Sequence, residues 1–357
     1  MKTVHASEYA VQMKHCCKSF GRVVANDNVD LRLKWGEIHA LLGENGSGKT
    51  TLVNMLSGIY QPDDGEIWVD GNQAVIDSPK TAYQLGIGMI HQHFMLVDVL
   101  SATENIILGQ KGGVLLNRRK VSAEICAMID QYGFHIDPNR KISEMSVSEK
   151  QTVEIIKALY RGAEILILDE PTAVLTPQET DRLFDVLRRM KDEGKCVVLI
   201  SHKINELFAV ADKVTILRKG KFIEELDMKA VTPDQLTSDM VGYPAKLSLN
   251  CPQSGEVKPY LSVRNLTVRG ISGAESVKNL SFDANAGEIL GIAGIAGSGQ
   301  KELCDALAGI TVPENGVIAA GGKEIQGMNP LSVYRAGIHL AYVPEDRLGM
   351  GLIPSMG

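Results

Sequence analysis

The stretch GENGSGKT, Gly43 to Thr50, constrains the fold of this chain more than any other feature. It matches the pattern G-x-x-x-x-G-K-[ST], follows the apolar run Ile38–Leu42, and precedes a helix predicted from Thr51 onward. A strand, a glycine-rich loop and a helix in this order build a phosphate site, because loop N–H groups and the helix N-terminus surround the anion. We therefore predict an α/β fold of the P-loop nucleotide-binding kind.

Each residue type of this loop has its own task. Lys49 is expected to reach the β- and γ-phosphates, and the Thr50 hydroxyl to ligate Mg²⁺. The ligands predicted for this loop are thus the phosphates of a nucleotide and Mg²⁺, and the family resemblance given below makes that nucleotide ATP. The remaining predicted nucleotide contacts are Gly43, Glu44, Asn45, Gly46, Ser47, Gly48 and Thr51.

Two further apolar runs end in polar side chains. Asp169 and Glu170 follow the run 165–168, and His202 comes two residues after the run 196–200. Four apolar residues in a row are typical of a strand buried on both faces, and ligands bind at the carboxyl ends of parallel strands. We predict that Asp169 ligates Mg²⁺ and that Glu170 polarises the attacking water. A single histidine after a strand is more often structural, but beside these residues we expect His202 to donate to a γ-phosphate oxygen.

An internal repeat relates the two ends of the chain by a shift of 251 residues. Gly43 and Gly48 correspond to Gly294 and Gly299, and glycine and proline positions agree without gaps over about sixty residues. Such agreement of turn-forming residues indicates a tandem duplication.

The second loop, GIAGSGQK, keeps the glycines but changes the ending. Gln300 stands where Lys49 stands in the first loop, and Lys301 replaces Thr50. An amide lacks the full positive charge, and an ammonium has no lone pair for a metal ion. We expect the second loop to support hydrolysis poorly.

Composition excludes several classes of protein. The net charge of −6 over 357 residues provides no basic surface typical of nucleic-acid binding. The six cysteines show no C-x-x-C spacing, so a zinc site is not predicted, and reduced thiols suit a chain of this length. No run of about 18 apolar residues occurs, and the N-terminus lacks the apolar core of a signal peptide. A role at a membrane would require a partner that spans it.

Together these motifs resemble the ATP-binding cassette (ABC) ATPase family over roughly residues 10 to 242. Gln92 stands at the family's Q-loop, where the resemblance makes it a catalytic residue and a Mg²⁺ ligand. Residues 145–149 stand at the signature, which places Ser146 against a nucleotide. Phe20 fits the aromatic residue that stacks on adenine, and His202 fills the H-loop.

The resemblance implies a mixed-sheet core, an antiparallel β subdomain and a helical subdomain at about 93–162. We expect a first ABC domain over 1–242, a linker over 243–258, and a truncated second ABC domain with a degenerate loop over 259–357. The counterpart of the signature would lie beyond residue 357, so we expect the chain to be a fragment that lacks one wall of its better site.

The subfamily is indicated by two fused cassettes, the loop GIAGSGQK and the string YVPEDR at 342–347. These look like the ATPase subunits of simple-sugar importers, and HQHFMLVDVLSATENIILG is most similar to the branch that handles nucleosides. This resemblance implies a peripheral protein at the cytoplasmic face of the cell membrane. Its partners would be transmembrane permease subunits, indirectly an extracytoplasmic substrate-binding protein, and another cassette in a head-to-tail pair; nucleic acid is not expected.

Some positions depart from the family pattern. Val147, Ser148 and Glu149 replace Gly-Gly-Gln, Thr152 replaces the usual arginine, and Thr176 replaces the D-loop aspartate. In a head-to-tail pair this weakened signature would face the weakened second loop, which leaves hydrolysis to the other site. Two alternatives remain: an ABC ATPase acting on ribosomes or DNA, and a regulatory module that binds nucleotide with little hydrolysis.

Overall fold

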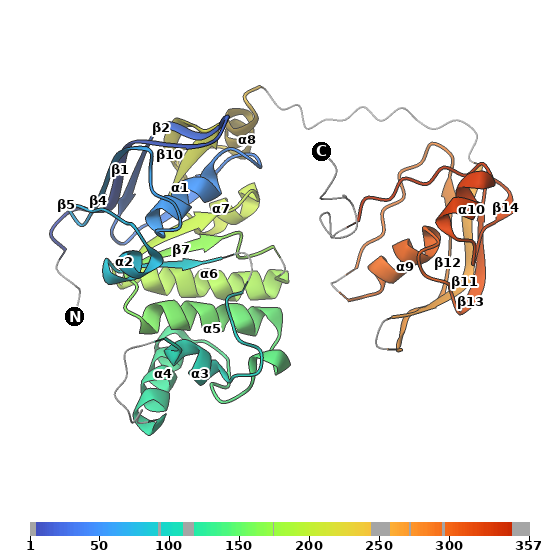
Figure 1. Ribbon diagram of the computed structural model, residues 1–357, viewed down its shortest axis with the longest axis horizontal. Helices are drawn as coiled ribbons and strands as arrows, with labels where there is room; N and C mark the ends of the chain where they lie inside the picture. Colours follow the sequence, from blue (N-terminus) through green and yellow to red (C-terminus); the bar gives the residue numbers. More distant parts are fainter. Residues whose placement is uncertain are drawn as a thin grey trace. The chain divides into compact units, whose positions relative to one another are not determined.

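The protein, seen in a computed structural model, divides into two compact units, Met1–Leu247 and Ser248–Gly357 (Figure 1). No helix within the described ranges is long and apolar enough to cross a membrane. The structure describes residues 5–91, 94–109, 118–173, 175–243, 258–270, 273–294 and 297–344.

A six-stranded mixed sheet forms the centre of unit 1, in the order β10-β9-β3-β8-β7-β6. The strands from β9 to β6 are parallel, and β10 pairs antiparallel with β9. The strands predicted at 38–42, 165–168 and 196–200, which the polar site residues follow, are confirmed. The strands are β3 (Ile38–Leu42), β6 (Ile87–Ile90), β7 (Ile165–Asp169), β8 (Cys196–Ile200), β9 (Lys213–Arg218) and β10 (Lys221–Asp227).

Alternate side chains of this sheet enter two separate hydrophobic cores. Leu166 and Leu168 of β7 lie in the core that also contains apolar residues of 153–159 and 183–190. Ile165 and Ile167 lie in the other core, with apolar residues of 52–56. Burial on both faces explains why β7 is continuously apolar up to Asp169 rather than alternating.

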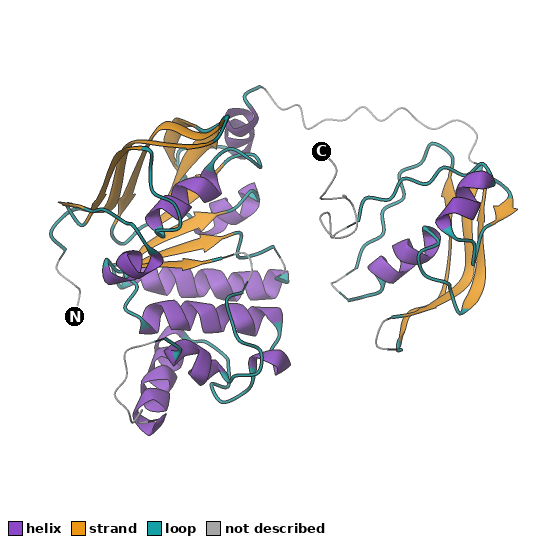
Figure 2. Ribbon diagram, viewed as in Figure 1, coloured by secondary structure: helices purple, strands orange, loops and turns teal. Residues whose placement is uncertain are grey.

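An antiparallel sheet and several helices accompany this core in the part of unit 1 that the structure describes (Figure 2). The antiparallel sheet has the order β2-β1-β4-β5 and contains β1 (Tyr9–Phe20), β2 (Val23–Lys34), β4 (Asp64–Val69) and β5 (Asn72–Gln73). The segments described in unit 1 are α1 (Lys49–Leu56), α2 (Pro79–Gln84), α3 (Ala102–Ile107), α4 (Arg118–Tyr132), the 3-10 helix η1 (Ile142–Glu144), α5 (Val147–Tyr160), α6 (Pro177–Asp192), α7 (Ile204–Val210) and α8 (Pro233–Val241).

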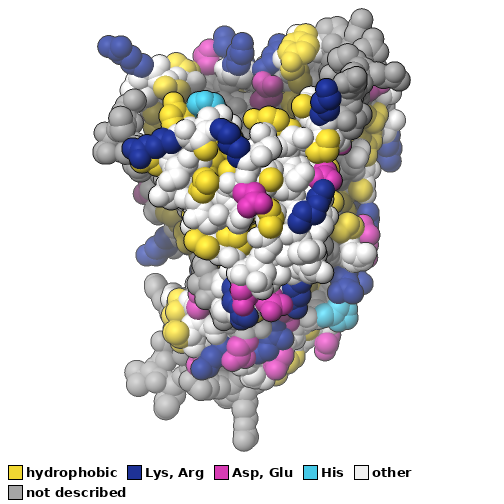
Figure 3. All heavy atoms as spheres, turned by 90° about the vertical axis from the view of Figure 1, so that its right-hand side faces the viewer, with side chains coloured by type: hydrophobic (Ala, Val, Ile, Leu, Met, Phe, Trp, Pro, Cys, Tyr) yellow, Lys and Arg dark blue, Asp and Glu magenta, His cyan; other side chains and the backbone are white. Residues whose placement is uncertain are grey.

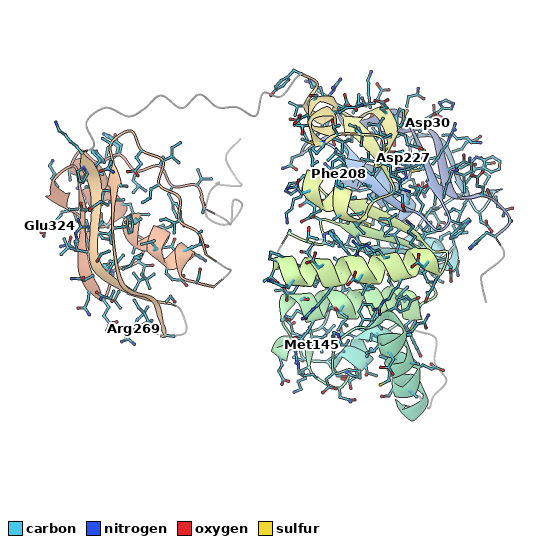
Figure 4. The ribbon with its side chains drawn as sticks, turned by 180° about the vertical axis from the view of Figure 1, so that it is seen from behind. Asp30, Met145, Phe208, Asp227, Arg269 and Glu324 are labelled. Carbon is cyan, nitrogen blue, oxygen red and sulfur yellow. The ribbon has the colours of Figure 1, made fainter. Side chains whose placement is uncertain are left out.

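The helical part of unit 1 lies to one side of the central sheet. There α3 and α4 pack against α5, while α6 packs on β3 and β8. Figure 4 labels Met145, which immediately precedes the N-cap residue of α5, in this helical part. The arrangement gives the mixed sheet, antiparallel sheet and helical layer that the resemblance implied.

Unit 2 repeats the antiparallel sheet and two helices of unit 1. Its sheet has the order β12-β11-β13-β14, and its core contains Val263, Leu303 and Ile318. In sequence, α9 starts 251 residues after α1 and α10 starts 251 residues after α2. The elements are β11 (Pro259–Arg269), β12 (Glu275–Asn285), α9 (Gln300–Leu307), β13 (Asn315–Ala320), β14 (Lys323–Glu324) and α10 (Pro330–Arg335).

The counterparts of β3 and β6 form no strands in unit 2: residues 289–293 and 338–341 are irregular. In unit 1, β8 and β7 stand between β3 and β6, so these two strands never pair with each other. Within the described residues of unit 2, their counterparts therefore have no neighbouring strand, and Ile289 is 98% exposed. Hydrophobic side chains at the surface are yellow in Figure 3.

Candidate functional site

The first glycine-rich loop connects β3 to α1 and requires glycine at both ends. Gly48, the N-cap of α1, has a φ of +97°, which L side chains rarely adopt. A Cβ atom there would lie 2.3 Å from the carbonyl oxygen of Ala25, and one on Gly43 would lie 2.3 Å from that of Leu217. The loop backbone is thus packed too closely for side chains at these positions, and its exposed part contains Glu44, Asn45 and Gly46.

Lys49 points back into the loop. Its Nζ atom donates to the carbonyl oxygens of Gly43, at 2.7 Å, and Glu44, at 2.9 Å. The residue is only 6% exposed. Burial lowers the pKa of Lys49, and the nearby carboxylates of Glu170 and Asp169 oppose that effect. Among the described residues no carboxylate bonds to this cation directly, so it is held under the loop as a phosphate site requires.

Thr50, in the first turn of α1, meets Asp169 at the carboxyl end of β7. The Thr50 hydroxyl donates to Oδ2 of Asp169 at 3.4 Å. Burial raises the pKa of Asp169, and the neighbouring Glu170 carboxylate raises it further. One hydroxyl and one carboxylate oxygen match the few protein ligands that Mg²⁺ takes beside nucleotide phosphates. Across the described part of the chain, no cluster of three or more His, Cys, Asp or Glu side chains could hold a metal.

Glu170 and His202 contact each other, in addition to the contacts of Lys49 with the loop and of Thr50 with Asp169. The Glu170 N–H donates to the carbonyl oxygen of Ile200 at 3.0 Å, which ties the end of β7 to β8. Oε1 of Glu170 lies 3.0 Å from Nδ1 of His202. Three strand ends thus bring Lys49, Asp169 and this pair to one edge of the sheet.

A family model described as "ABC transporter" matches residues 26–173 and 277–356, which include this loop and β7. The chain belongs to the ABC transporter family. Its first unit has the architecture of an ABC ATPase, and the family match implies that it binds ATP.

Curated relatives of this ABC protein extend over nearly the whole chain. The nucleoside import ATP-binding protein NupA of Lactococcus lactis subsp. cremoris is 44% identical over 353 residues, which are 98% of this chain and 69% of that protein. The guanosine import ATP-binding protein NupO of Bacillus subtilis is 44% identical, with 97% of this chain and 68% of that protein covered. A ribose import ATP-binding protein of Caldanaerobacter subterraneus is 40% identical, with 97% and 69% covered.

Solved ABC cassettes resemble the fold. A nucleotide-free cassette of an ABC transporter superposes with a TM-score of 0.57 and 22% identity, covering 66% of this chain and 96% of that one. The dimeric bacterial cassette MJ0796 gives 0.54 and 26% identity, covering 62% of this chain and all of that one. These matches confirm the predicted ABC ATPase fold.

Phe20 ends β1 and presents its ring to solvent. It is 42% exposed and meets Tyr60 edge to face, with ring centroids 5.0 Å apart. The ammonium group of Lys18 lies 5.8 Å from the Phe20 ring centroid. An exposed aromatic face on the antiparallel sheet of an ABC cassette is suited to stacking on a base.

Ser146 is engaged in a helix cap. Its hydroxyl oxygen accepts from the N–H of Glu149 at 3.3 Å, and its own N–H donates to Oε2 of Glu149 at 2.8 Å. Arg140 pairs with the same carboxylate. The Ser-x-x-Glu spacing of this capping box is readable in the sequence. A phosphate at Ser146 would have to replace at least one of these hydrogen bonds.

The second loop is arranged differently from the first. Nε2 of Gln300 donates to the carbonyl oxygen of Ile292 at 2.9 Å, so its amide is occupied by the preceding segment. Lys301 is exposed. Gln92 and the motif residues 345–347 lie outside the described residues.

The resemblance places Thr172 in the D-loop of the family, but sequence reasoning predicted neither its contact with Glu206 nor any role for Glu206. Thr172 donates its hydroxyl hydrogen to Oε2 of Glu206 at 2.5 Å, which links the loop after β7 to α7. Neither residue belongs to a spacing pattern that predicts this contact, because the contact depends on how α7 packs.

Proposed function

We propose that this chain binds Mg²⁺-ATP on unit 1 and hydrolyses it to power import of a nucleoside through a membrane permease. The observation that supports hydrolysis is the meeting of Lys49, Thr50–Asp169 and Glu170–His202 at one sheet edge. The two relatives at 44% identity are named for nucleoside and guanosine import, and a ribose relative is 40% identical. The higher identity to the nucleoside and guanosine importers favours a nucleoside over a simple sugar as the substrate.

Each residue has a role in the proposed reaction. Lys49 holds the terminal phosphates, while Thr50 and Asp169 would hold Mg²⁺, which neutralises phosphate charge when bound. Glu170 orients and polarises the attacking water, and His202 donates to the γ-phosphate. Phe20 stacks on adenine. Gln92 is proposed as a further catalytic residue and Mg²⁺ ligand, and Ser146 as a contact to nucleotide on an opposite cassette.

We further propose that the nucleotide site is completed by another cassette in a head-to-tail pair. The related cassette MJ0796 is dimeric. Domain bounds of 1–242 and 259–357, with a linker at 243–258, fit a tandem arrangement. The protein would lie at the cytoplasmic face of the membrane, against permease subunits that receive substrate from an extracytoplasmic binding protein.

Hydrolysis is tested by phosphate release from the purified chain, with Glu170→Gln as the matched variant. We expect Mg²⁺-ATP to bind and to turn over slowly without a complete partner cassette. Loss of a positioned general base typically costs about 10²–10⁴-fold in rate. Robust turnover by the isolated monomer, abolished in Glu170→Gln, would contradict the need for a partner.

Transport is tested in proteoliposomes that contain the chain, its permease and the substrate-binding protein. ATP-dependent uptake of labelled guanosine, absent with Glu170→Gln, is the expected result. Uptake of labelled ribose instead would overturn the nucleoside assignment, and ATP hydrolysis without either uptake would overturn the transport role.

A further inference from the structure

The contact between Glu170 and His202 is not held by itself. Its two side chains are 21% and 52% exposed, so water competes for this single contact and it is weak by itself. Glu170 also has a φ of +48°, in the left-handed region. A non-glycine residue persists there only when surrounding contacts fix the backbone. The neighbouring structure must therefore provide the constraint.

Glu206 gathers three donors from the loops that follow β7 and β8. Its Oε2 atom accepts from the hydroxyls of Thr172, at 2.5 Å, and Ser201, at 3.1 Å. Its Oε1 atom lies 2.9 Å from Nζ of Lys203, which also donates to the carbonyl oxygen of Thr172 at 3.0 Å. Thr172 follows Glu170 by two residues, and Ser201 immediately precedes His202. One carboxylate thus joins the loops after β7 and β8.

The hydrogen bonds of Glu206 are more buried than the contact between Glu170 and His202, so we expect them to be the more rigid of the two. Thr172 and Ser201 are each 2% exposed. Hydrogen bonds from hydroxyls to a carboxylate are short and roughly twice as strong as neutral ones. A buried hydroxyl that lost the Glu206 carboxylate would be left without an acceptor, which is costly.

The position of Glu206 on its helix shows that these contacts replace an ordinary cap. Lys203 is the N-cap of α7, so Glu206 occupies the third helical position. At that position Glu104, Glu149 and Glu179 all return to the N–H of their N-cap residues. In α7 the N–H of Lys203 instead donates to the Ser201 hydroxyl at 3.1 Å. Glu206 is committed to the two strand-end loops.

We propose that Glu206 is a positioning residue, which through Thr172 and Ser201 holds Glu170 against His202 in the hydrolytic site. The claim that this positioning serves catalysis rests on the proposed function. The claim that Glu206 keeps Glu170 next to His202 does not rest on it, because that contact is present in the nucleotide-free chain.

Four variants of the full chain test the proposal. Thr172→Val removes the hydroxyl at nearly constant volume, and Thr172→Ser keeps it. Glu206→Leu removes the acceptor. Asn205→Ala changes an exposed neighbour on α7 and serves as the control. Should Glu206→Leu not fold, the two threonine variants still carry the comparison.

The direct readout is the ¹⁵N signal of the His202 ring in the nucleotide-free chain, assigned with His202→Gln. We expect Thr172→Val and Glu206→Leu to move this signal toward that of a free imidazole, with Thr172→Ser and Asn205→Ala at the wild-type position. Unmoved His202 signals in both Thr172→Val and Glu206→Leu would overturn the proposal. This measurement needs no hydrolysis.

The second readout is single-turnover hydrolysis with the chain in excess over ATP. Misplacement of a reacting group by about 1 Å can cost 10²-fold in rate, so we expect ten- to a hundredfold slower hydrolysis in Thr172→Val, with ATP affinity changed less than about twofold. A parallel loss of affinity and thermal stability would instead mean a general structural role. Absence of hydrolysis in the wild type even when a complete partner cassette is supplied would refute the proposed function, while the ring signals would still decide the role of Glu206.

Discussion

Replacing Lys49 with methionine should change the stability of the nucleotide-free and nucleotide-bound protein in opposite directions. Burial lowers the pKa of Lys49 below its usual 10.5, so the charged form opposes folding at neutral pH. Lys49→Met removes that charge and keeps an unbranched chain of similar length. We expect the variant to melt at a higher temperature than the wild type without nucleotide. The part of this difference that comes from charge should shrink as the pH rises past 10.5, because the lysine then loses its proton in the unfolded chain as well.

The same variant should lose its response to ATP. Lys49 donates to two loop carbonyl oxygens, and in the bound state we expect about two charge-assisted bonds to phosphate, of which each contributes about 1.5–3 kcal/mol. A loss of about 3 kcal/mol weakens affinity roughly 10²-fold. Mg²⁺-ATP at 100 times the wild-type Kd stabilises by about 2.7 kcal/mol, or roughly 5–10 °C for a unit of this size. At that concentration the variant should gain only about 1 °C.

Thermal unfolding of the chain with and without Mg²⁺-ATP measures both effects, and Gln300→Ala is the matched control in the second loop. Because Nε2 of Gln300 bonds to the preceding segment, its removal should leave the ATP shift unchanged. Equal loss of the shift in Lys49→Met and Gln300→Ala would refute the assignment of nucleotide binding to the first loop. If Lys49→Met melts at a lower temperature than the wild type without nucleotide, the charged lysine does not destabilise the nucleotide-free fold, and this prediction is wrong.

Asp169→Asn should stabilise the nucleotide-free chain at pH 7, because burial and Glu170 raise the pKa of this carboxyl. The gain in stability should shrink as the pH falls toward 3.8, where the aspartate becomes protonated. A gain in thermal melts that does not depend on pH would contradict this cause. Phe20→Ala should weaken ATP binding by about 1–3 kcal/mol if the ring stacks on the base, whereas Val23→Ala on β2 should leave a fluorescence titration unchanged. Gly48→Ala should abolish ATP binding and lower the melting temperature, because its Cβ would lie 2.3 Å from the Ala25 carbonyl oxygen; wild-type binding would show that the loop can shift.

The core of the site could be predicted from sequence because its signals are local. Continuous apolar runs identified β3, β7 and β8, and parallel strands bring their carboxyl ends to one edge. Asp169 and His202 were placed in the site on that rule, and the structure brings both to that edge, Asp169 to Thr50 and His202 to Glu170.

The remaining features depend on contacts that local patterns do not encode. Glu206 reaches Thr172 only because the fold brings the first turn of α7 to the loop after β7. Residues 289–293 share the apolar character of β3 but form no strand, because a strand of a parallel sheet also needs neighbours. The direction of Lys49 toward the loop carbonyls likewise follows from three-dimensional packing.

The strand order β10-β9-β3-β8-β7-β6 determines when β3 can pair with its neighbours during synthesis of the chain. β3 and its loop leave the ribosome early, but both neighbours of β3 come from residues 196–218. At 5–20 residues per second, roughly 10–30 s pass between synthesis of Thr50 and of the end of β9. The nascent chain thus carries an apolar strand without lateral partners during that interval. ATP is expected to find its binding loop only after translation has passed β9, and chaperones have that window in which to shield the unpaired strand.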